Sequence, residues 1–423
     1  MEESRDLDPC ACFGLRWFNR GEACAQTLRE SSSPTSIRPV FPPLKCARTG
    51  KPVKSEFEMV MSSGLLLQTR LFLRPAPKTC NVQAPSMNPR LLPLLVLLAT
   101  AGCSSPSAAK LRPAPFTSDA LSVCAGPPVR LNARHAGEGP LQILGSSRVL
   151  YVGDDRISAF QPGAGSADFR YPVKGANGLL MDAQGRLLCT EAGNRIVTRM
   201  ETNGSLRVIA SSYQGRPFNS PNDLSLDSKG RVYFTDPRYG KRDNLEQRDA
   251  AGNTVEGVYR IDPDGSVVRL LGRESVDRPN GILVSPDEKQ LFVADNNNTL
   301  GGTRKLWSFA LHPDGSVDPK TRRLVFDWKT SRGPDGLKID SKGRLFVAAG
   351  LNVDNPPHET SKPYPGGVYV LSQNGRLLDF IPIPRDEVTN CAFGGPDLKT
   401  LYITAGGSLW GVPLKEPGLG INR

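Results

Sequence analysis

The chain has 423 residues, of which 38% are hydrophobic and 22% are charged. These values are typical of a soluble globular protein and exclude a wholly disordered chain. The 42 Gly and 37 Pro residues lack the triplet period of collagen and favour a fold with many turns. The net charge of +11 is not gathered into runs of more than two Lys or Arg, so we expect no nucleic-acid partner.

Residues 1–86 are rich in Pro and Ser and show no sustained helical or strand period. We expect this segment to be disordered, or to be an upstream extension assigned to the protein in error. Most of the nine cysteines lie here, the chain has only three His, and no C-x-x-C pair occurs. A structural zinc site built from Cys and His is therefore not expected.

Residues 87–103 have the three-part layout of a secretory signal. Arg90 precedes the apolar stretch Leu91–Ala101, which is too short to span a bilayer. The Ala-Gly-Cys ending resembles a bacterial lipoprotein signal, which implies lipidation of Cys103 and an anchor on the periplasmic side of the cell envelope. Translation from Met87 would give this signal its usual place. A buried core segment is the alternative.

Residues 104–117 are expected to form a flexible tether, and residues 417–423 a tail. Between them, residues 118–416 show short apolar runs rich in Val, Leu, Phe and Tyr, which are typical of strands. An Asp-x-x-Gly sequence precedes several runs, as at Asp182, Asp227 and Asp340, and predicts hairpin turns. No convincing amphipathic helix occurs in this region.

One polar residue recurs at intervals of 39, 45, 58, 55 and 55 residues, just before or within an apolar run. A period of roughly 40–55 residues with several strands in each unit predicts an all-β, six-bladed β-propeller. The first strand of each blade lines the central channel, so the six side chains should converge at its mouth. Asn-Gly and Asp-Gly pairs are also common in plain turns, which is the alternative. The six residues are Glu138, Asn177, Asn222, Asn280, Asp335 and Asn390.

Two carboxylates and several amides form a set of hard oxygen donors, so we expect one divalent cation, with calcium as the first candidate. Zinc, manganese and magnesium are further candidates, although a site without His or Cys would not bind zinc tightly.

Several strings in residues 118–416 resemble the gluconolactonase and senescence marker protein (regucalcin) family: EGP at Glu138, SPND at Asn222, PNG at Asn280 and PDG at Asp335. The resemblance implies a six-bladed propeller that hydrolyses a sugar lactone with one divalent ion. It implies that Glu138, Asn280 and Asp335 are metal ligands, and that Asn222 contacts the substrate or completes the metal shell. Ser220 departs from the animal members, which have Arg at this position.

In the expected mechanism, the lactone carbonyl oxygen binds the metal, and a water molecule attacks the carbonyl carbon. Asp335 is the candidate to orient or deprotonate that water, or it is a ligand only. Asn177, Asn222 and Asn390 would bind substrate hydroxyls or the metal. Arg238 and Tyr239 would contact substrate at the rim, unless their loop is an ordinary surface loop.

Two other functions fit the same residues: a phosphotriesterase-like or arylesterase-like propeller hydrolase, and a non-enzymatic envelope propeller that binds calcium or another ligand. No G-x-S-x-G or G-x-G-x-x-G motif occurs, so a serine hydrolase or a nucleotide cofactor is not indicated. The expected partner is a small-molecule lactone. We expect the protein to contact a membrane only through its lipid anchor. No oligomeric state is predicted.

Overall fold

The computed structural model describes residues 122–132, 135–143 and 145–420. Within them, no helix is long and apolar enough to cross a membrane. The predicted extension (1–86), signal segment (87–103) and tether (104–117), and with them Cys103, lie outside the described residues.

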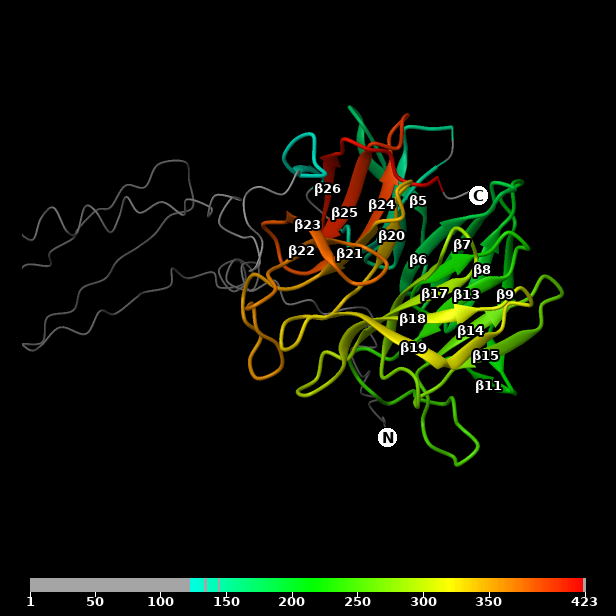
Figure 1. The fold of residues 1–423 in the computed structure, drawn as a ribbon. Coiled ribbons are helices and arrows are strands. Elements are labelled where there is room, and N and C mark those ends of the chain that lie inside the picture. Colours follow the sequence, from blue (N-terminus) through cyan, green and yellow to red (C-terminus); the bar gives the residue numbers. More distant parts are fainter. Residues whose placement is uncertain (1–121, 133–134, 144, 421–423) are drawn as a thin grey trace, which may run out of the picture. The chain divides into compact units, whose positions relative to one another are not determined.

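In the described part of the chain, the strands form six four-stranded antiparallel sheets and one small hairpin (Figure 1). We call the sheets blades A to F in the order of their inner strands along the chain. Within each blade, the strands are given from the innermost to the outermost. Blade A contains β2 (Glu138–Gln142), β3 (Val149–Gly153), β4 (Arg156–Gln161) and β5 (Gly165–Arg170). Blade B contains β6 (Ala176–Met181), β7 (Leu187–Glu191), β8 (Ile196–Met200) and β9 (Leu206–Ala210). Blade C contains β12 (Leu224–Leu226), β13 (Val232–Asp236), β14 (Gly257–Ile261) and β15 (Val267–Leu271).

Blade D contains β16 (Pro279–Val284), β17 (Gln290–Asn296), β18 (Arg304–Leu311) and β19 (Val317–Asp327). Blade E contains β20 (Leu337–Ile339), β21 (Leu345–Ala349), β22 (Gly367–Leu371) and β23 (Leu377–Pro382). Blade F contains β24 (Val388–Gly394), β25 (Thr400–Ala405), β26 (Ser408–Pro413) and β1 (Val129–Asn132). The hairpin is β10 (Ser212–Tyr213) with β11 (Arg216–Pro217).

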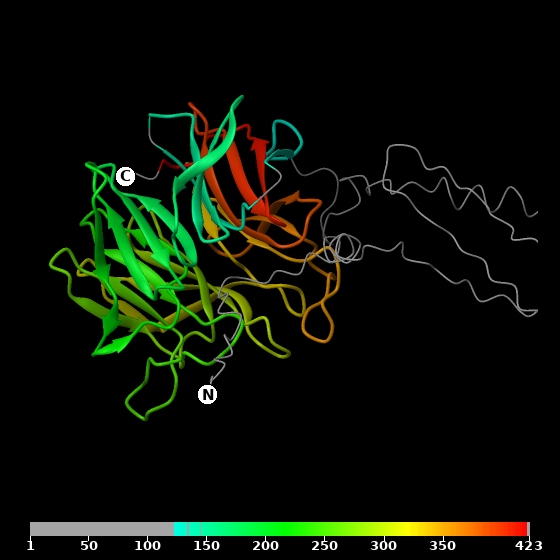
Figure 2. The same cartoon turned by 180° about the vertical axis from the view of Figure 1, so that it is seen from behind.

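The inner strands close into a ring. β2 contacts β6, β6 contacts β12, β12 contacts β16, β16 contacts β20, β20 contacts β24, and β24 contacts β2. The first strand of the described residues, β1, pairs with β26, so the cyan segment lies beside the red C-terminal strands (Figures 1 and 2). The predicted all-β, six-bladed propeller is confirmed, and the two ends of the domain complete the same blade.

The predicted Asp-x-x-Gly turns connect the first and second strands of blades B, C and E. In blade C, Asp227 Oδ1 accepts the backbone N–H groups of Lys229 and Arg231, both at 3.0 Å, and Oδ2 accepts the Arg231 Nε–H at 2.5 Å. Asp182 with Arg186 and Asp340 with Arg344 repeat these contacts. The Asp side chain thus satisfies the backbone donors of the turn, which explains why this residue begins each turn.

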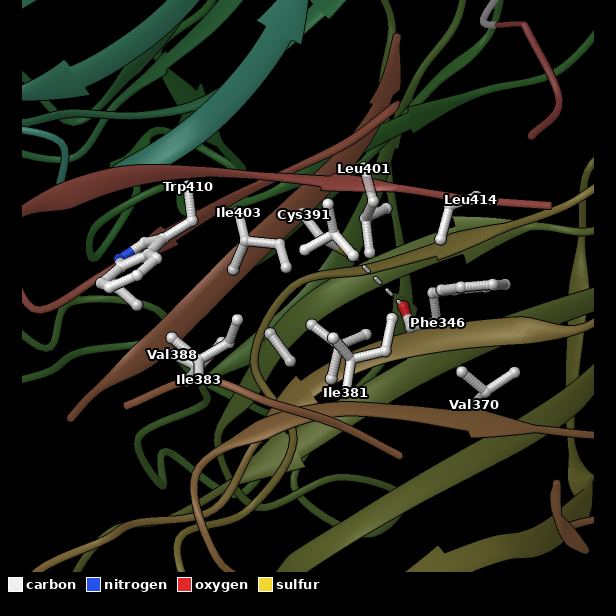
Figure 3. Packing of buried hydrophobic residues seen from close by; sticks show 14 of the residues in the cluster. Phe346, Val370, Ile381, Ile383, Val388, Cys391, Leu401, Ile403, Trp410 and Leu414 are labelled. Carbon is white, nitrogen blue, oxygen red and sulfur yellow. Dashed lines mark hydrogen bonds between the residues drawn. The ribbon is translucent and has the colours of Figure 1, made fainter. Parts of the chain in front are cut away.

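The hydrophobic core is divided among the spaces between neighbouring blades. Between blades E and F, Phe346 and Val370 face Cys391, Leu401 and Trp410, all of them buried (Figure 3). Phe346 and Phe393 meet edge to face with their ring centroids 5.0 Å apart. This packing fixes each blade against the next and therefore fixes the spacing of the inner strands around the channel.

Candidate functional site

The six recurring polar residues all lie at the first residues of an inner strand or just before it. Each is less than a tenth exposed, which is unusual for acids and amides. Blade A contributes Glu138, blade B Asn177, blade C Asn222, blade D Asn280, blade E Asp335 and blade F Asn390. Because the inner strands form a closed ring, we call these six residues the polar ring.

One hydrogen bond and several electrostatic interactions connect four members of the polar ring across the chain. Asn390 Nδ2 donates a hydrogen bond to Glu138 Oε2 at 3.1 Å, which joins residues 252 positions apart. Asn280 is close enough to Asp335 to act on its carboxyl and lower its pKa, and the charges of Asp335 and Glu138 interact. Asn222 is held through its backbone, whose carbonyl accepts the Gly178 N–H at 2.8 Å. Asn177 shares the burial and the strand position of the others.

The Gly that follows several of these residues does not form a hairpin turn. It allows the inner strands of neighbouring blades to lie close together. A Cβ added at Gly281 would lie 2.2 Å from the backbone oxygen of Asp335 in the next blade. A Cβ added at Gly336 would lie 2.0 Å from the side-chain oxygen of Asn390. Only glycine lets neighbouring inner strands come this close, so the Asn-Gly and Asp-Gly pairs bring the polar ring together.

A third acid, Asp223, belongs to this site and was missed at the sequence level. It directly follows Asn222, and its charge acts on both Glu138 and Asp335. Its Oδ2 is buried and has no hydrogen-bond partner among the described residues. A signal was present, because SPND has Asp where four of the six units have Gly.

Burial and mutual repulsion raise the pKa values of these carboxyl groups. For Glu138, burial is the largest cause, followed by the charges of Asp335 and Asp223. Burial also raises the pKa of Asp335 to about 7, although the nearby Arg332 opposes the rise. Burial raises the pKa of Asp223. A cation bound beside these three acids would stabilise their ionised form.

Arg332 is a second residue that the sequence did not single out. Its guanidinium is buried and lies 3.8 Å from Asp335 Oδ2, 3.3 Å from Glu387 Oε1 and 4.0 Å from Glu359 Oε2. The signal was its place three residues before Asp335 in SRGPDG. At 3.8 Å this contact of Arg332 with Asp335 is an ion pair that is longer than a hydrogen bond.

The two predicted rim residues face different surroundings. Tyr239 Oη donates a hydrogen bond to the backbone oxygen of Asn296 at 3.0 Å, and Asp335 is one of the groups that raise the pKa of Tyr239, after burial. Arg238 turns to the following loop, where its Nε bonds Lys241 O at 2.9 Å and its Nη2 bonds Asp243 Oδ1 at 3.2 Å. Tyr239 therefore lies near the polar ring, whereas these Arg238 contacts order the loop.

The donor set of the polar ring fits a hard divalent cation. No group of three or more His, Cys, Asp or Glu side chains in the described part of the chain is arranged to hold a metal ion. The ring is a different kind of set, with two acids and four amides supplied by separate blades. Carboxylate and amide oxygens suit calcium, and the unpartnered oxygen of Asp223 adds negative charge beside them. The residues present thus fit a bound cation.

Comparison with known proteins decides the family. Residues 136–407 match the family described as SMP-30/Gluconolactonase/LRE-like region, which covers most of the propeller. The chain belongs to this family. The predicted resemblance is therefore confirmed.

Two curated relatives share much of the chain. A gluconolactonase from Zymomonas mobilis is 32% identical over 292 residues, covering 63% of this chain and 75% of that protein. The pentonolactonase XacC from Haloferax volcanii is 26% identical over 276 residues, covering 64% and 81%. The solved structure of a gluconolactonase from Xanthomonas campestris superposes with a TM-score of 0.54 at 29% identity, covering 67% of this chain and 87% of that one.

Proposed function

We propose that this protein is a lactonase that opens a sugar lactone with the help of one divalent cation, calcium being the first candidate. The observation that carries the proposal is the polar ring, in which Glu138 and Asp335 come from separate blades and interact in a buried site. Membership of the family and the lactonase relatives support the same reaction.

Glu138, Asn222, Asn280 and Asp335 are the residues that would hold the cation. When bound, the cation supplies a Lewis acid that polarises the lactone carbonyl. Asn390 orients Glu138 through its 3.1 Å hydrogen bond, and Arg332 positions Asp335 from 3.8 Å. These supporting contacts fix the direction in which the carboxylate oxygens point.

Asp335 is the group that we propose to orient the attacking water and accept its proton. A buried carboxylate in the polar ring can both orient a water molecule and accept its proton. Tyr239 lies near Asp335, and we propose that it contacts the sugar together with Asn177 and Asn390. Near-normal turnover by a folded Asp335→Asn variant would show that Asp335 is not the base.

The deciding experiment is a turnover screen of the purified protein against aldonolactones of five and six carbons. Calcium, manganese, zinc or magnesium is added after chelation. We expect lactone opening that stops in chelator and returns with one of these ions. Turnover of an aryl ester or an organophosphate without lactone turnover would favour the esterase-type alternative. Cation binding without any turnover would favour a binding protein.

We also propose that Cys103 is lipidated and anchors the protein at the periplasmic side of a bacterial envelope. The support is the sequence of residues 87–103 alone. Metabolic labelling with a fatty acid in a bacterial host should mark the wild-type protein and not Cys103→Ser. Equal labelling of both would refute the anchor.

A further inference from the structure

A depression of about 460 Å³ lies on the polar-ring side of blades D and E, apart from the ring itself. It lies between the loop that joins β17 to β18 and the loop that joins β21 to β22, with residues from both loops in its wall. The residues that matter for its chemistry are Arg304, Lys305, Asp327, Lys329, Thr330 and Thr360. The volume is within the range of sites that hold small molecules.

The charge of this depression is positive. Three cations line it against the single acid Asp327, which pairs with Lys329 at 3.0 Å. Lys305 lies opposite Asp327 in the strand pairing but forms no ion pair with any described carboxylate, and its ammonium lies 5.5 Å from the ring centroid of Trp307. The described part of the chain therefore leaves an excess of positive charge around this hollow.

Arg304 forms the buried side of the depression and is 4% exposed. Its two Nη groups donate to the backbone oxygens of Gly302, Thr299 and His358, and these bonds tie the two loops together. No described carboxylate forms an ion pair with it, and its Nε has no hydrogen-bond partner. Glu359 interacts with Arg304 electrostatically but pairs with Arg332. A buried cation without a paired carboxylate favours an anion beside it.

The wall also offers hydroxyl groups. Thr330 Oγ1 and Thr360 Oγ1 lie 2.8 Å apart and share a hydrogen bond, and both residues line the depression. An anion that also carries hydroxyls would therefore find cationic and hydroxyl partners in one place.

The depression is separate from the polar ring but shares a wall with it. His358 and Thr360 line the depression, whereas Glu359 between them is buried and pairs with Arg332, which contacts Asp335. A ligand in the depression would thus lie on the far side of the Arg332 network from the reacting centre.

We propose that this depression binds a polyhydroxy carboxylate, the chemical class of the product. The choice of ligand rests on the proposed function, because addition of water to a lactone yields a hydroxy acid that ionises to a carboxylate and a proton. The carboxylate is placed near Lys305, Lys329 and Arg304, and the hydroxyls near Thr330 and Thr360.

The test is calorimetric titration of the purified protein with sodium D-gluconate in excess chelator, so that a cation at the ring cannot account for binding. Sorbitol, acetate and inorganic phosphate serve as comparison ligands. The double variant Lys305→Gln with Lys329→Gln should weaken gluconate binding at least tenfold. Lys342→Gln is the control because Lys342, like Lys329, is an exposed lysine in a single ion pair, here with Glu416 at 2.8 Å.

Gluconate binding that is lost in the double variant and retained in the control supports the proposal. Absence of binding, or equal binding by the double variant, overturns it. Equally tight binding of sorbitol overturns the role of the cations, and equally tight binding of acetate or phosphate overturns the role of the hydroxyls. Lactone turnover is measured separately, so failure of the proposed reaction would show as an inactive wild type whether or not gluconate binds.

Discussion

Replacement of Gly281 by Ala tests whether close approach of the inner strands assembles the site. The added Cβ would lie 2.2 Å from the Asp335 backbone oxygen and 2.8 Å from Leu337 Cδ2. A non-bonded carbon and oxygen normally stay about 3.3 Å apart. Blades D and E must therefore separate by about 1 Å at this point, since backbone cannot rotate away as a flexible side chain can.

The separation should affect both stability and function. Overpacking of this kind costs about 1–3 kcal/mol of unfolding free energy. Because Asn280 directly precedes Gly281, and the added Cβ meets the backbone of Asp335, the same shift pulls two proposed ligands apart. A misplacement of about 1 Å in a catalytic arrangement can lower activity by about 10²-fold.

The assay compares cation affinity by calorimetry, lactone turnover and thermal unfolding for Gly281→Ala and Gly137→Ala. Gly137 is the control because it precedes Glu138, yet its added Cβ would be 3.5 Å from the nearest atom, Val152 O, an ordinary contact. We expect loss of affinity and turnover in Gly281→Ala only. Wild-type affinity and turnover in a folded Gly281→Ala protein would refute the role of inter-blade spacing.

Three further predictions follow from the same contacts. Glu138→Gln should retain the fold but lose cation binding and turnover; undiminished affinity in calorimetry would exclude Glu138 as a ligand. Without a cation, the pKa values of Glu138 and Asp335 are raised, so protons compete with the cation as the pH falls below about 7. Cation affinity should therefore fall with decreasing pH, by up to about tenfold per pH unit for each proton displaced, and equal affinities at pH 6 and pH 8 would contradict this. Asp227→Ala leaves the buried Arg231 without its carboxylate partner and should lower the free energy of unfolding in denaturant by about 3–5 kcal/mol. The control, Asp264→Ala at an exposed position, should change it by less than about 0.5 kcal/mol. Equal effects of the two variants would show that the Asp227–Arg231 pair does not stabilise the fold.

Much of the architecture could be predicted because its signals are local. A turn such as Asp227 to Arg231 is encoded within five residues, and the strand runs and the recurring polar positions follow one another along the chain. A period with six units therefore predicts six blades, and it predicts which residue of each blade reaches the channel.

The sequence by itself thus determined the blade number, the hairpin turns and the six members of the polar ring. Only the tertiary structure decided that β1 completes the last blade, that Asp223 and Arg332 join the site, and that Gly281 and Gly336 serve contact between blades. The reason is distance along the chain. Asn390 hydrogen-bonds Glu138, which lies 252 residues away in the sequence. Such a contact depends on how closely the six blades pack around the axis, and no local sequence pattern encodes that packing.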